Sequence, residues 1–123
     1  MTYADPPFLL VVDDDPSVLL LVDVLAEKMG FRVKAVSNGL HALEHLRDGL
    51  QPSVILLDIM MERIDGLTFM NHLREMPALQ DTPVVAMSTP AVLERYGSRL
   101  QVSGTLLKPL TSATLSDALA KYR

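Results

Sequence analysis

The sequence contains no cysteine and no tryptophan, and aromatic residues make up only 5% of its 123 residues. The lack of cysteine excludes both a disulfide framework and a thiolate metal site. No apolar stretch approaches the roughly 18 residues that a membrane span needs, because Asp23 interrupts the richest one. The first residues, Met-Thr-Tyr-Ala-Asp-Pro-Pro, also lack the basic and then apolar plan of a signal peptide. These absences predict a cytoplasmic protein that makes no membrane contact.

Basic residues are too few and too scattered for a nucleic-acid binder. The 11 lysines and arginines are outnumbered by 15 acidic residues, and the formal net charge is -4. We therefore expect no direct binding to nucleic acid. An apolar content of 49% suits a chain of this length with one core, and no linker, repeat or low-complexity segment divides it. The sequence predicts a single domain over residues 1–123.

Short apolar runs alternate five times with helical patterns along the chain. This alternation is typical of βα units, and apolar runs without internal alternation are typical of parallel strands covered on both faces. The sequence therefore predicts an α/β fold with a five-stranded parallel sheet. The expected strands cover about residues 8–13, 31–37, 54–57, 84–88 and 104–108. The expected helices cover about residues 16–29, 40–48, 66–75, 91–100 and 112–122.

Local signals place several of these boundaries. Asp15 suits the N-cap of the first helix and Pro16 its first position, where a missing N–H costs nothing. Asn38-Gly39 is interpreted as a turn before the second helix. Pro90 and Gly97 are poor helix formers and weaken the helical pattern of residues 91–100.

Polar residues stand where four of the expected strands end. Asp13 and Asp14 follow the first strand, Asp58 closes the third, Ser88 the fourth and Lys108 the fifth. Because the carboxyl ends of parallel strands meet at one edge, where open α/β sheets hold their ligands, we expect these side chains to lie together.

The chemistry of this group points to magnesium and phosphoryl transfer. Three carboxylates and one ammonium leave two negative charges uncompensated, which a divalent cation would balance. Mg²⁺ prefers oxygen ligands and keeps several waters, so the carboxylates and the backbone carbonyl of Met60 would suffice. Phosphoryl transfer needs an in-line acceptor, which Asp58 can be, and positive charge around the transferred oxygens.

In its motifs the sequence resembles the receiver domain of two-component response regulators. The resemblance rests on Val11-Val12-Asp13-Asp14, Asp58 at a strand end, Asp65-Gly66 seven residues later, Ser88 at another strand end, and Lys108-Pro109. It implies a doubly wound, flavodoxin-like sheet with strand order 2-1-3-4-5 and helices on both faces. It implies that Asp58 is the phosphoacceptor and that Asp13, Asp14, Asp58 and the Met60 carbonyl hold Mg²⁺. Ser88 and Lys108 would contact the phosphoryl group.

The function implied by the resemblance is a phosphorylation-dependent signalling switch. The phosphoryl group would come from a sensor histidine kinase or a histidine phosphotransfer protein, and a downstream protein would read the changed surface. Such a domain is not an enzyme beyond removal of its own phosphoryl group. Pro109 has a mechanical use here, because the bond before it can kink or become cis and so aim Lys108 inward.

Several residues depart from the family pattern. Glu62 replaces the usual proline, and Thr89 and Pro90 follow Ser88 where a small residue is common. Thr105 stands in place of a common aromatic residue, so we expect no output through an aromatic rotamer flip. Met60 and Pro90 occupy positions that often orient the hydrolytic water in relatives, and neither side chain offers a suitable hydrogen-bonding group. The acyl phosphate is therefore expected to persist.

Two alternative functions remain open from the sequence. The departures suit a receiver-like interaction module that acts without phosphorylation. Asp13 and Asp15 could match the nucleophile motif of a small haloacid-dehalogenase-like phosphohydrolase, although the chain lacks the late acidic pair and the larger sheet of such enzymes.

The first helix has hardly any polar face, which suggests a partner on its outer side at residues such as Leu20. That partner could be the phosphodonor or a second copy of the chain. A homodimer through the face of the fourth and fifth helices is the other arrangement left open.

Overall fold

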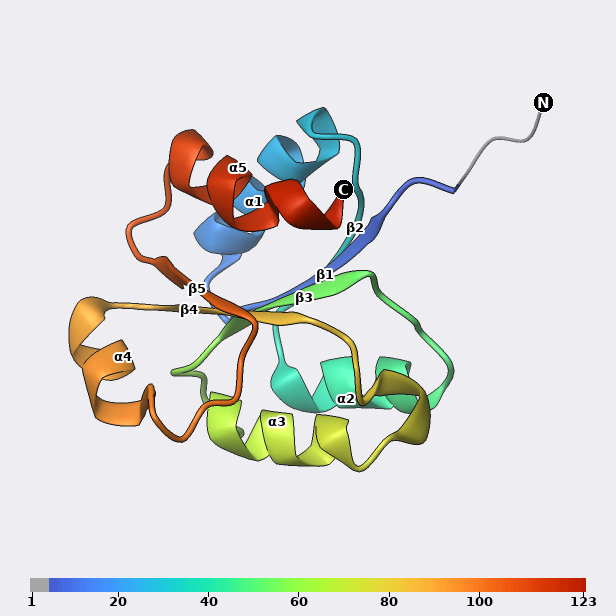
Figure 1. The fold of residues 1–123 in the computed structure, drawn as a ribbon, viewed down its shortest axis with the longest axis vertical. Coiled ribbons are helices and arrows are strands. Elements are labelled where there is room, and N and C mark those ends of the chain that lie inside the picture. Colours follow the sequence, from blue (N-terminus) through green and yellow to red (C-terminus); the bar gives the residue numbers. More distant parts are fainter. Residues whose placement is uncertain (1–4) are drawn as a thin grey trace.

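The chain forms a five-stranded parallel sheet in the order β2-β1-β3-β4-β5 (Figure 1). The structure, a computed structural model, describes residues 5–123, so the first four residues of the predicted domain lie outside it. The strands are β1 (Phe8–Val12), β2 (Arg32–Val36), β3 (Val54–Asp58), β4 (Val84–Ser88) and β5 (Gly104–Leu107). The predicted fold class and the strand order implied by the resemblance are both confirmed.

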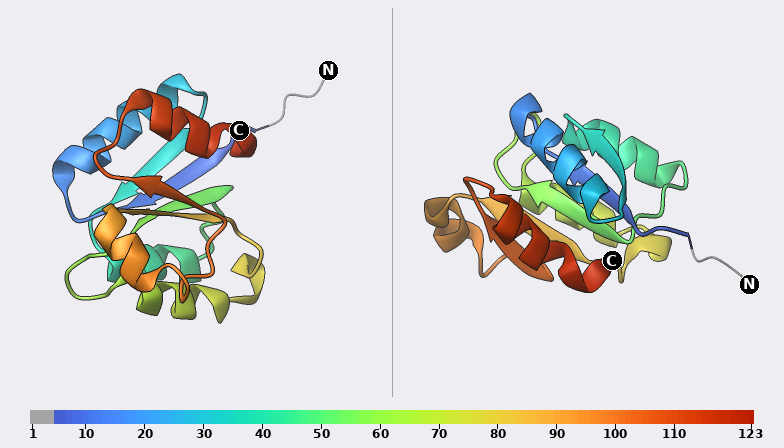
Figure 2. Two further views of the ribbon diagram at one scale, coloured as in Figure 1. Left: turned by 60° about the vertical axis from the view of Figure 1, so that its left-hand side comes forward. Right: turned by 90° about the horizontal axis from the view of Figure 1, so that it is seen from above.

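Helices cover both faces of the sheet (Figures 1 and 2). Helices α1 (Pro16–Lys28) and α5 (Ser112–Leu119) pack on one face. Helices α2 (Gly39–Arg47), α3 (Gly66–Arg74) and α4 (Pro90–Tyr96) pack on the other. Short 3₁₀ segments follow α3, at η1 (Pro77–Leu79), and α5, at η2 (Ala120–Tyr122). Among the described residues no helix combines the length and apolarity that a bilayer crossing requires.

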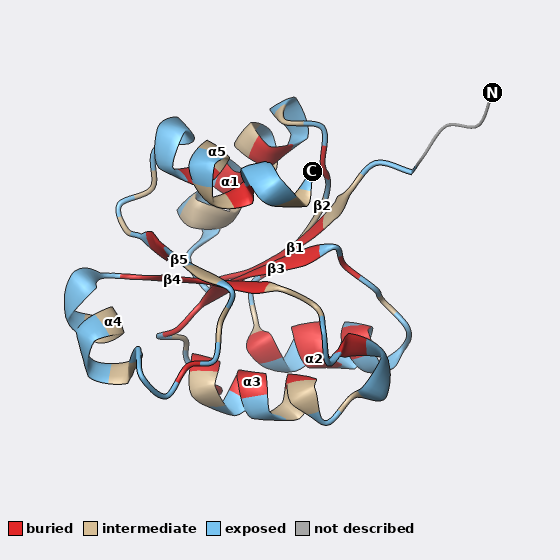
Figure 3. Cartoon of the chain, in the orientation of Figure 1, coloured by how far each residue is buried: buried red, intermediate tan, exposed pale blue. Residues whose placement is uncertain are grey.

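The central strands are buried on both faces, as their unbroken apolar runs predicted (Figure 3). Successive side chains of a strand point to opposite faces of the sheet, so each strand contributes side chains to two hydrophobic cores. In β1, Leu9 and Val11 join the core beneath α1 and α5, whereas Leu10 and Val12 join the core beneath α2 and α3. Two packed layers therefore hold the strand ends in place.

Two local predictions need correction, and one short element was not predicted. Asn38-Gly39 is not a separate turn, because the Asn38 side chain accepts a hydrogen bond from Leu40 N–H and caps α2 at Gly39. Helix α4 ends at Tyr96 rather than near residue 100, with Gly97 as its C-cap. The 3₁₀ turn η1 was not predicted, since a three-residue segment shows no periodicity.

Proline helped to start α4 rather than to weaken it. Pro90 occupies the first turn, where its missing N–H has no helical partner to lose. The same arrangement holds at α1, where Asp15 accepts a hydrogen bond from Ser17 N–H and Pro16 is the first helical residue, as predicted.

Candidate functional site

The polar residues singled out in the sequence sit at or just beyond four strand ends. Asp58 and Ser88 are the last residues of β3 and β4. Asp13 and Lys108 follow β1 and β5, and the ladder of hydrogen bonds continues through them. Asp13 N–H donates to Val36 O at 3.2 Å, and Lys108 N–H donates to Ser88 O at 2.9 Å. The backbone of each polar residue is therefore fixed by its neighbouring strand.

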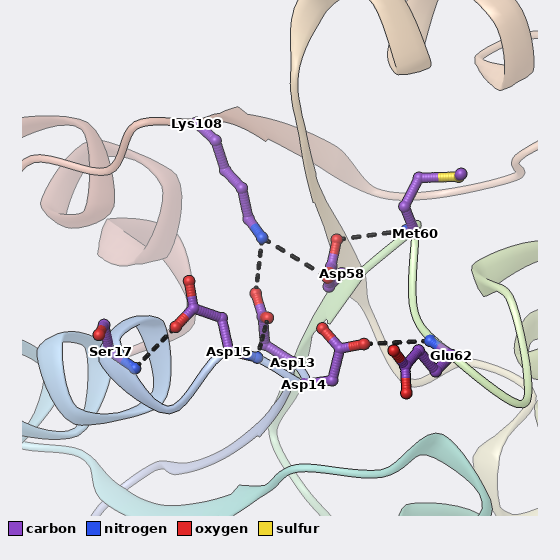
Figure 4. Close-up of polar contacts among 8 residues, drawn as sticks. All are labelled: Asp13, Asp14, Asp15, Ser17, Asp58, Met60, Glu62 and Lys108. Atoms are coloured by element: carbon purple, nitrogen blue, oxygen red, sulfur yellow. Dashed lines mark hydrogen bonds and ion pairs between the residues drawn. The ribbon is translucent and has the colours of Figure 1, made fainter.

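These side chains surround one pocket at the carboxyl edge of the sheet. Figure 4 shows those of Asp13, Asp58 and Lys108 pointing toward one another. The pocket has a volume of about 260 Å³. The structure thus brings together all six residues proposed from the sequence as site residues. The lining residues are Asp13, Asp14, Asp15, Asp58, Met60, Ser88, Thr89, Val92 and Lys108.

Lys108 reaches into the pocket and pairs with two carboxylates. Its Nζ lies 2.8 Å from Oδ2 of Asp13 and 3.5 Å from Oδ2 of Asp58. Burial lowers the pKa of Lys108, but the hydrogen bond to Asp13 and the charge of Asp58 outweigh it, so that the pKa is raised. The ammonium stays protonated at neutral pH. The peptide bond between Lys108 and Pro109 is cis, one of the two geometries anticipated for it.

Asp58 is an unusually weak carboxylic acid in this setting. Burial raises its pKa most, the nearby charge of Asp13 adds to the rise, and Lys108 partly offsets both, for a pKa of about 6. Met60 N–H also donates to Oδ1 of Asp58 at 3.2 Å and favours the ionised form. Asp58 is therefore mostly ionised at pH 7 but close to titration.

Backbone N–H groups hold the other two carboxylates. Asp15 N–H donates to Oδ1 of Asp13 at 2.9 Å, and Glu62 N–H donates to Oδ2 of Asp14 at 3.0 Å. The first bond is local and typical of an Asp followed by a turn. The second joins segments 48 residues apart, and nothing in the sequence indicated it.

The donor set suits a hard divalent cation. One carboxylate oxygen from each of Asp13, Asp14 and Asp58 lies within 4.8 Å of the others. A carboxylate oxygen that accepts one hydrogen bond keeps a lone pair for a metal. Three carboxylates and one ammonium leave net negative charge, and oxygen ligands of this kind are those that Mg²⁺ prefers. The residues present therefore fit the predicted cation.

Of the three departures at positions 62, 89 and 105, the one at Thr89 lines the pocket. Thr89 lines it and is exposed, whereas Glu62 is exposed on the loop between β3 and α3. Thr105 is exposed on β5. Val92 also lines the pocket and was not predicted. Its position one helical turn beyond Thr89 is the signal that could have placed it there.

Comparison with known proteins decides the family. The profile described as "Response regulator receiver domain" matches residues 9–120. The chain belongs to the response regulator receiver domain family. Receiver domains are signalling domains of two-component systems, and the chain carries such a domain.

Individual relatives agree with this assignment. The chain is 36% identical over 99 residues to the response regulator Rre1 of Synechocystis, covering 80% of this chain and 41% of that protein. It spans between 12% and 50% of the lengths of seven further curated relatives.

Solved structures show the same fold. The chemotaxis response regulator CheY4 of Vibrio cholerae matches with a TM-score of 0.87 and 25% identity, over 96% of this chain and 99% of that one. The receiver domain of the sensor histidine kinase PA1611 from Pseudomonas aeruginosa matches with a TM-score of 0.85 and 21% identity, over 95% of this chain and 97% of that one. The PA1611 structure holds a magnesium ion coordinated in its active site cleft.

Proposed function

We propose that this receiver domain is a phosphorylation-dependent switch in which Asp58 accepts a phosphoryl group with the help of Mg²⁺. The observation that carries the proposal is the setting of Asp58. This carboxylate is 4% exposed, borders an open pocket, and has the Lys108 ammonium 3.5 Å from one of its oxygens. A cation held by Asp13, Asp14, Asp58 and the Met60 carbonyl would neutralise the charge of the incoming phosphoryl group.

Asp58, Lys108 and Ser88 would have different roles in the phosphoryl transfer. An oxygen of Asp58 forms a bond to phosphorus while the bond to the donor breaks, and the donor keeps the electron pair. With a pKa of about 6, Asp58 is ionised and ready to attack at pH 7. Lys108 would stabilise the equatorial oxygens, and the buried hydroxyl of Ser88 would donate to one of them. The donor is proposed to be the phosphohistidine of a sensor histidine kinase or a histidine phosphotransfer protein.

The added charge supplies the driving force for switching. A phosphoryl group adds a charge of about −1.5 to −2 at neutral pH. A nearby hydroxyl group can move to donate a hydrogen bond to it. Ser88 is followed directly by Thr89 and by α4, so its movement would change the surface of α4 and β5. Leu107 is 49% exposed on β5, next to the exposed Thr105. A downstream protein is proposed to read this face.

The outer face of α1 is the proposed contact for the phosphodonor. Helix α1 buries Val22 and Ala26 against the sheet, yet Leu20 and Val24 remain 66% and 45% exposed. The helix begins beside the pocket, so a donor that reaches Asp58 would pass over this apolar face. A second copy of the chain on α1, or on the α4 and α5 face, is the alternative occupant.

The remaining predictions complete the proposal. Residues 1–123 would act as one receiver domain in the cytoplasm, without membrane contact and without direct binding to nucleic acid. The domain would consume its own side chain in the reaction and would not turn over a separate substrate.

Incubation with acetyl phosphate and Mg²⁺, followed by intact mass spectrometry, tests the proposal. We expect one added phosphoryl group that is absent from the Asp58→Asn variant and is much reduced when Mg²⁺ is chelated. No added mass in the wild-type protein, together with binding to a partner, would favour an interaction module. Steady release of phosphate from small phosphomonoesters would favour the phosphohydrolase.

A further inference from the structure

The loop between β3 and α3 touches the metal-binding carboxylates at a point that the sequence did not reveal. Glu62 N–H donates to Oδ2 of Asp14 at 3.0 Å (Figure 4). Among the hydrogen bonds of residues 5–123, it is the one that reaches the Asp14 carboxylate. Asp14 is exposed, unlike Asp13 and Asp58, so the packing that orients those two carboxylates does not orient this one.

The backbone of the loop fixes the direction of this N–H group. Arg63 has a φ of 69°, and Ile64 N–H donates to Glu62 O at 2.7 Å, which makes a γ-turn centred on Arg63. Such a turn is strained for a residue with a side chain and persists only where its surroundings hold it.

The surroundings of the turn meet that requirement. Ile64 is 6% exposed in the core, and Gly66 N–H donates to Ile59 O at 2.9 Å, which closes the base of the loop. The Asp65 side chain also accepts a hydrogen bond from Thr68 N–H at 2.8 Å and caps α3. Both ends of the turn are thus anchored, and the Glu62 N–H is held pointing at Asp14.

We infer that the peptide N–H of Glu62 is a positioning group for the cation, because it holds one oxygen of Asp14 and leaves the other free for Mg²⁺. The inference rests on the proposed magnesium site. It gives the departure at position 62 a physical meaning, since the proline usual at this position of the family has no N–H to donate. The loop also carries Met60, the proposed carbonyl ligand, so cation binding and loop conformation form one unit.

The test compares two variants that both remove the Glu62 carboxylate. Glu62→Pro also removes the N–H, whereas Glu62→Ala keeps it. Hydrogen-bond partners of ligating carboxylates are worth about 10-fold or more in metal affinity, so Glu62→Pro should raise the Kd for Mg²⁺ about 10-fold in titration calorimetry. Glu62→Ala should change it by less than about 3-fold, since the lost charge is exposed and screened. Equal affinities of the two variants would overturn the inference.

A second measurement needs no proline and no metal. In metal-free wild-type protein the Glu62 amide should exchange slowly with solvent, and in Asp14→Ala it should exchange faster by at least several-fold. Amide exchange resolved by NMR decides this even if Glu62→Pro does not fold. Equal exchange rates in the two proteins would overturn the inference.

The two proposals fail in different ways. A wild-type protein that binds Mg²⁺ and accepts a phosphoryl group, with Glu62→Pro indistinguishable from Glu62→Ala, would overturn only the role of the Glu62 N–H. A wild-type protein that binds no Mg²⁺ would overturn both the proposed magnesium site and this role.

Discussion

Lys108 and Asp13 form the shorter of the two ion pairs at the site, with 2.8 Å between Nζ and Oδ2. Asp13 has no exposed surface, so this ammonium is what compensates a fully buried charge. The distance from Lys108 to Asp58 is longer, at 3.5 Å. The lysine is therefore paired mainly with Asp13 and more weakly with Asp58.

Replacing Lys108 by Met should destabilise the metal-free domain by about 1 to 3 kcal/mol, because a buried carboxylate loses its partner. This destabilisation should be smaller when Mg²⁺ is added, since the cation supplies the missing positive charge. Urea unfolding with and without Mg²⁺ measures both effects. Lys108→Arg, which keeps the charge, is the control. A Lys108→Met variant as stable as the wild type without Mg²⁺ would show that the pair contributes nothing.

Asp58→Asn should stabilise the metal-free domain at pH 7. The pKa of Asp58 is about 6 in the folded protein and 3.8 in the reference state, so the folded state binds the proton more tightly. Protonation of the Asp58 carboxylate therefore stabilises the folded state. This contribution is fully present below a pH of about 3.8 and is lost as the pH rises through about 6. The free energy of unfolding of Asp58→Asn should thus exceed that of the wild type by about 2 to 3 kcal/mol at pH 7, and the difference should vanish near pH 4. Denaturant unfolding at several pH values checks the sign, and an Asn variant less stable at pH 7 contradicts it.

The phosphorylated domain should lose its phosphoryl group slowly. Met60 is 53% exposed and lines the pocket without a side-chain group that could orient water. Met60→Asn should speed the loss by about 10-fold or more, in line with the usual effect of a positioned polar group. The decay of phosphorylated protein in Mg²⁺ buffer, followed by intact mass, gives the half-life. A wild-type half-life of a minute or less, or a variant with an unchanged half-life, would speak against this role of Met60.

Leu20→Glu should slow phosphotransfer from a histidine donor while leaving phosphorylation by acetyl phosphate unchanged. Leu20 is 66% exposed, so the change should alter stability by less than about 0.5 kcal/mol. Leu107→Glu on β5, where the side chain is 49% exposed, is the matched control for an apolar surface elsewhere.

The mass of the two variants in solution separates the possible dimers. A dimer lost only with Leu20→Glu would place the second copy on α1, and one lost only with Leu107→Glu would place it at β5 beside α4 and α5. Unchanged transfer rates and unchanged mass in Leu20→Glu would remove α1 as an interface.

Gly66→Ala should destabilise the domain by about 1 to 3 kcal/mol, as overpacking in a tight core does. A Cβ at Gly66 would lie 2.9 Å from the backbone Cα of Ile59 and 2.8 Å from the Cδ1 of its side chain. The backbone atom cannot yield, so the loop between β3 and α3 would have to shift. Thermal unfolding measures the loss. Gly30→Ala is an instructive comparison, because its φ of 99° makes it strained although no atom lies within 4 Å. Full stability of Gly66→Ala would show that the loop adapts freely.

Much of the architecture could be predicted because its signals are local. The run Val54 to Leu57 is apolar without alternation, and the strand is indeed buried on both faces. Asp15 and Pro16 marked the start of α1 correctly, since capping depends only on neighbouring residues. Asn38 was misread because the same residue type suits a turn and an N-cap, and the hydrogen bond that its side chain accepts from Leu40 N–H is what distinguishes them.

The strand order illustrates a different kind of success. It came from the resemblance to a family, because apolar periodicity states which segments are strands but not which strands are neighbours. The register pairs Leu9 of β1 with Val54 of β3 and with Val33 of β2, contacts between segments far apart in the chain.

By itself, the sequence determined the alternation of strands and helices, and therefore the presence of acids, a hydroxyl and a lysine at four strand ends. Periodicity and capping are properties of a few adjacent residues, which is why they can be read directly. Only the tertiary structure decided that the Lys108 ammonium lies closer to Asp13 than to Asp58, and that burial raises the pKa of Asp58. It also decided that Glu62 N–H donates a hydrogen bond to the Asp14 carboxylate. Each of these depends on distances across the fold, and electrostatic and hydrogen-bond energies vary too steeply with distance for a one-dimensional pattern to specify them.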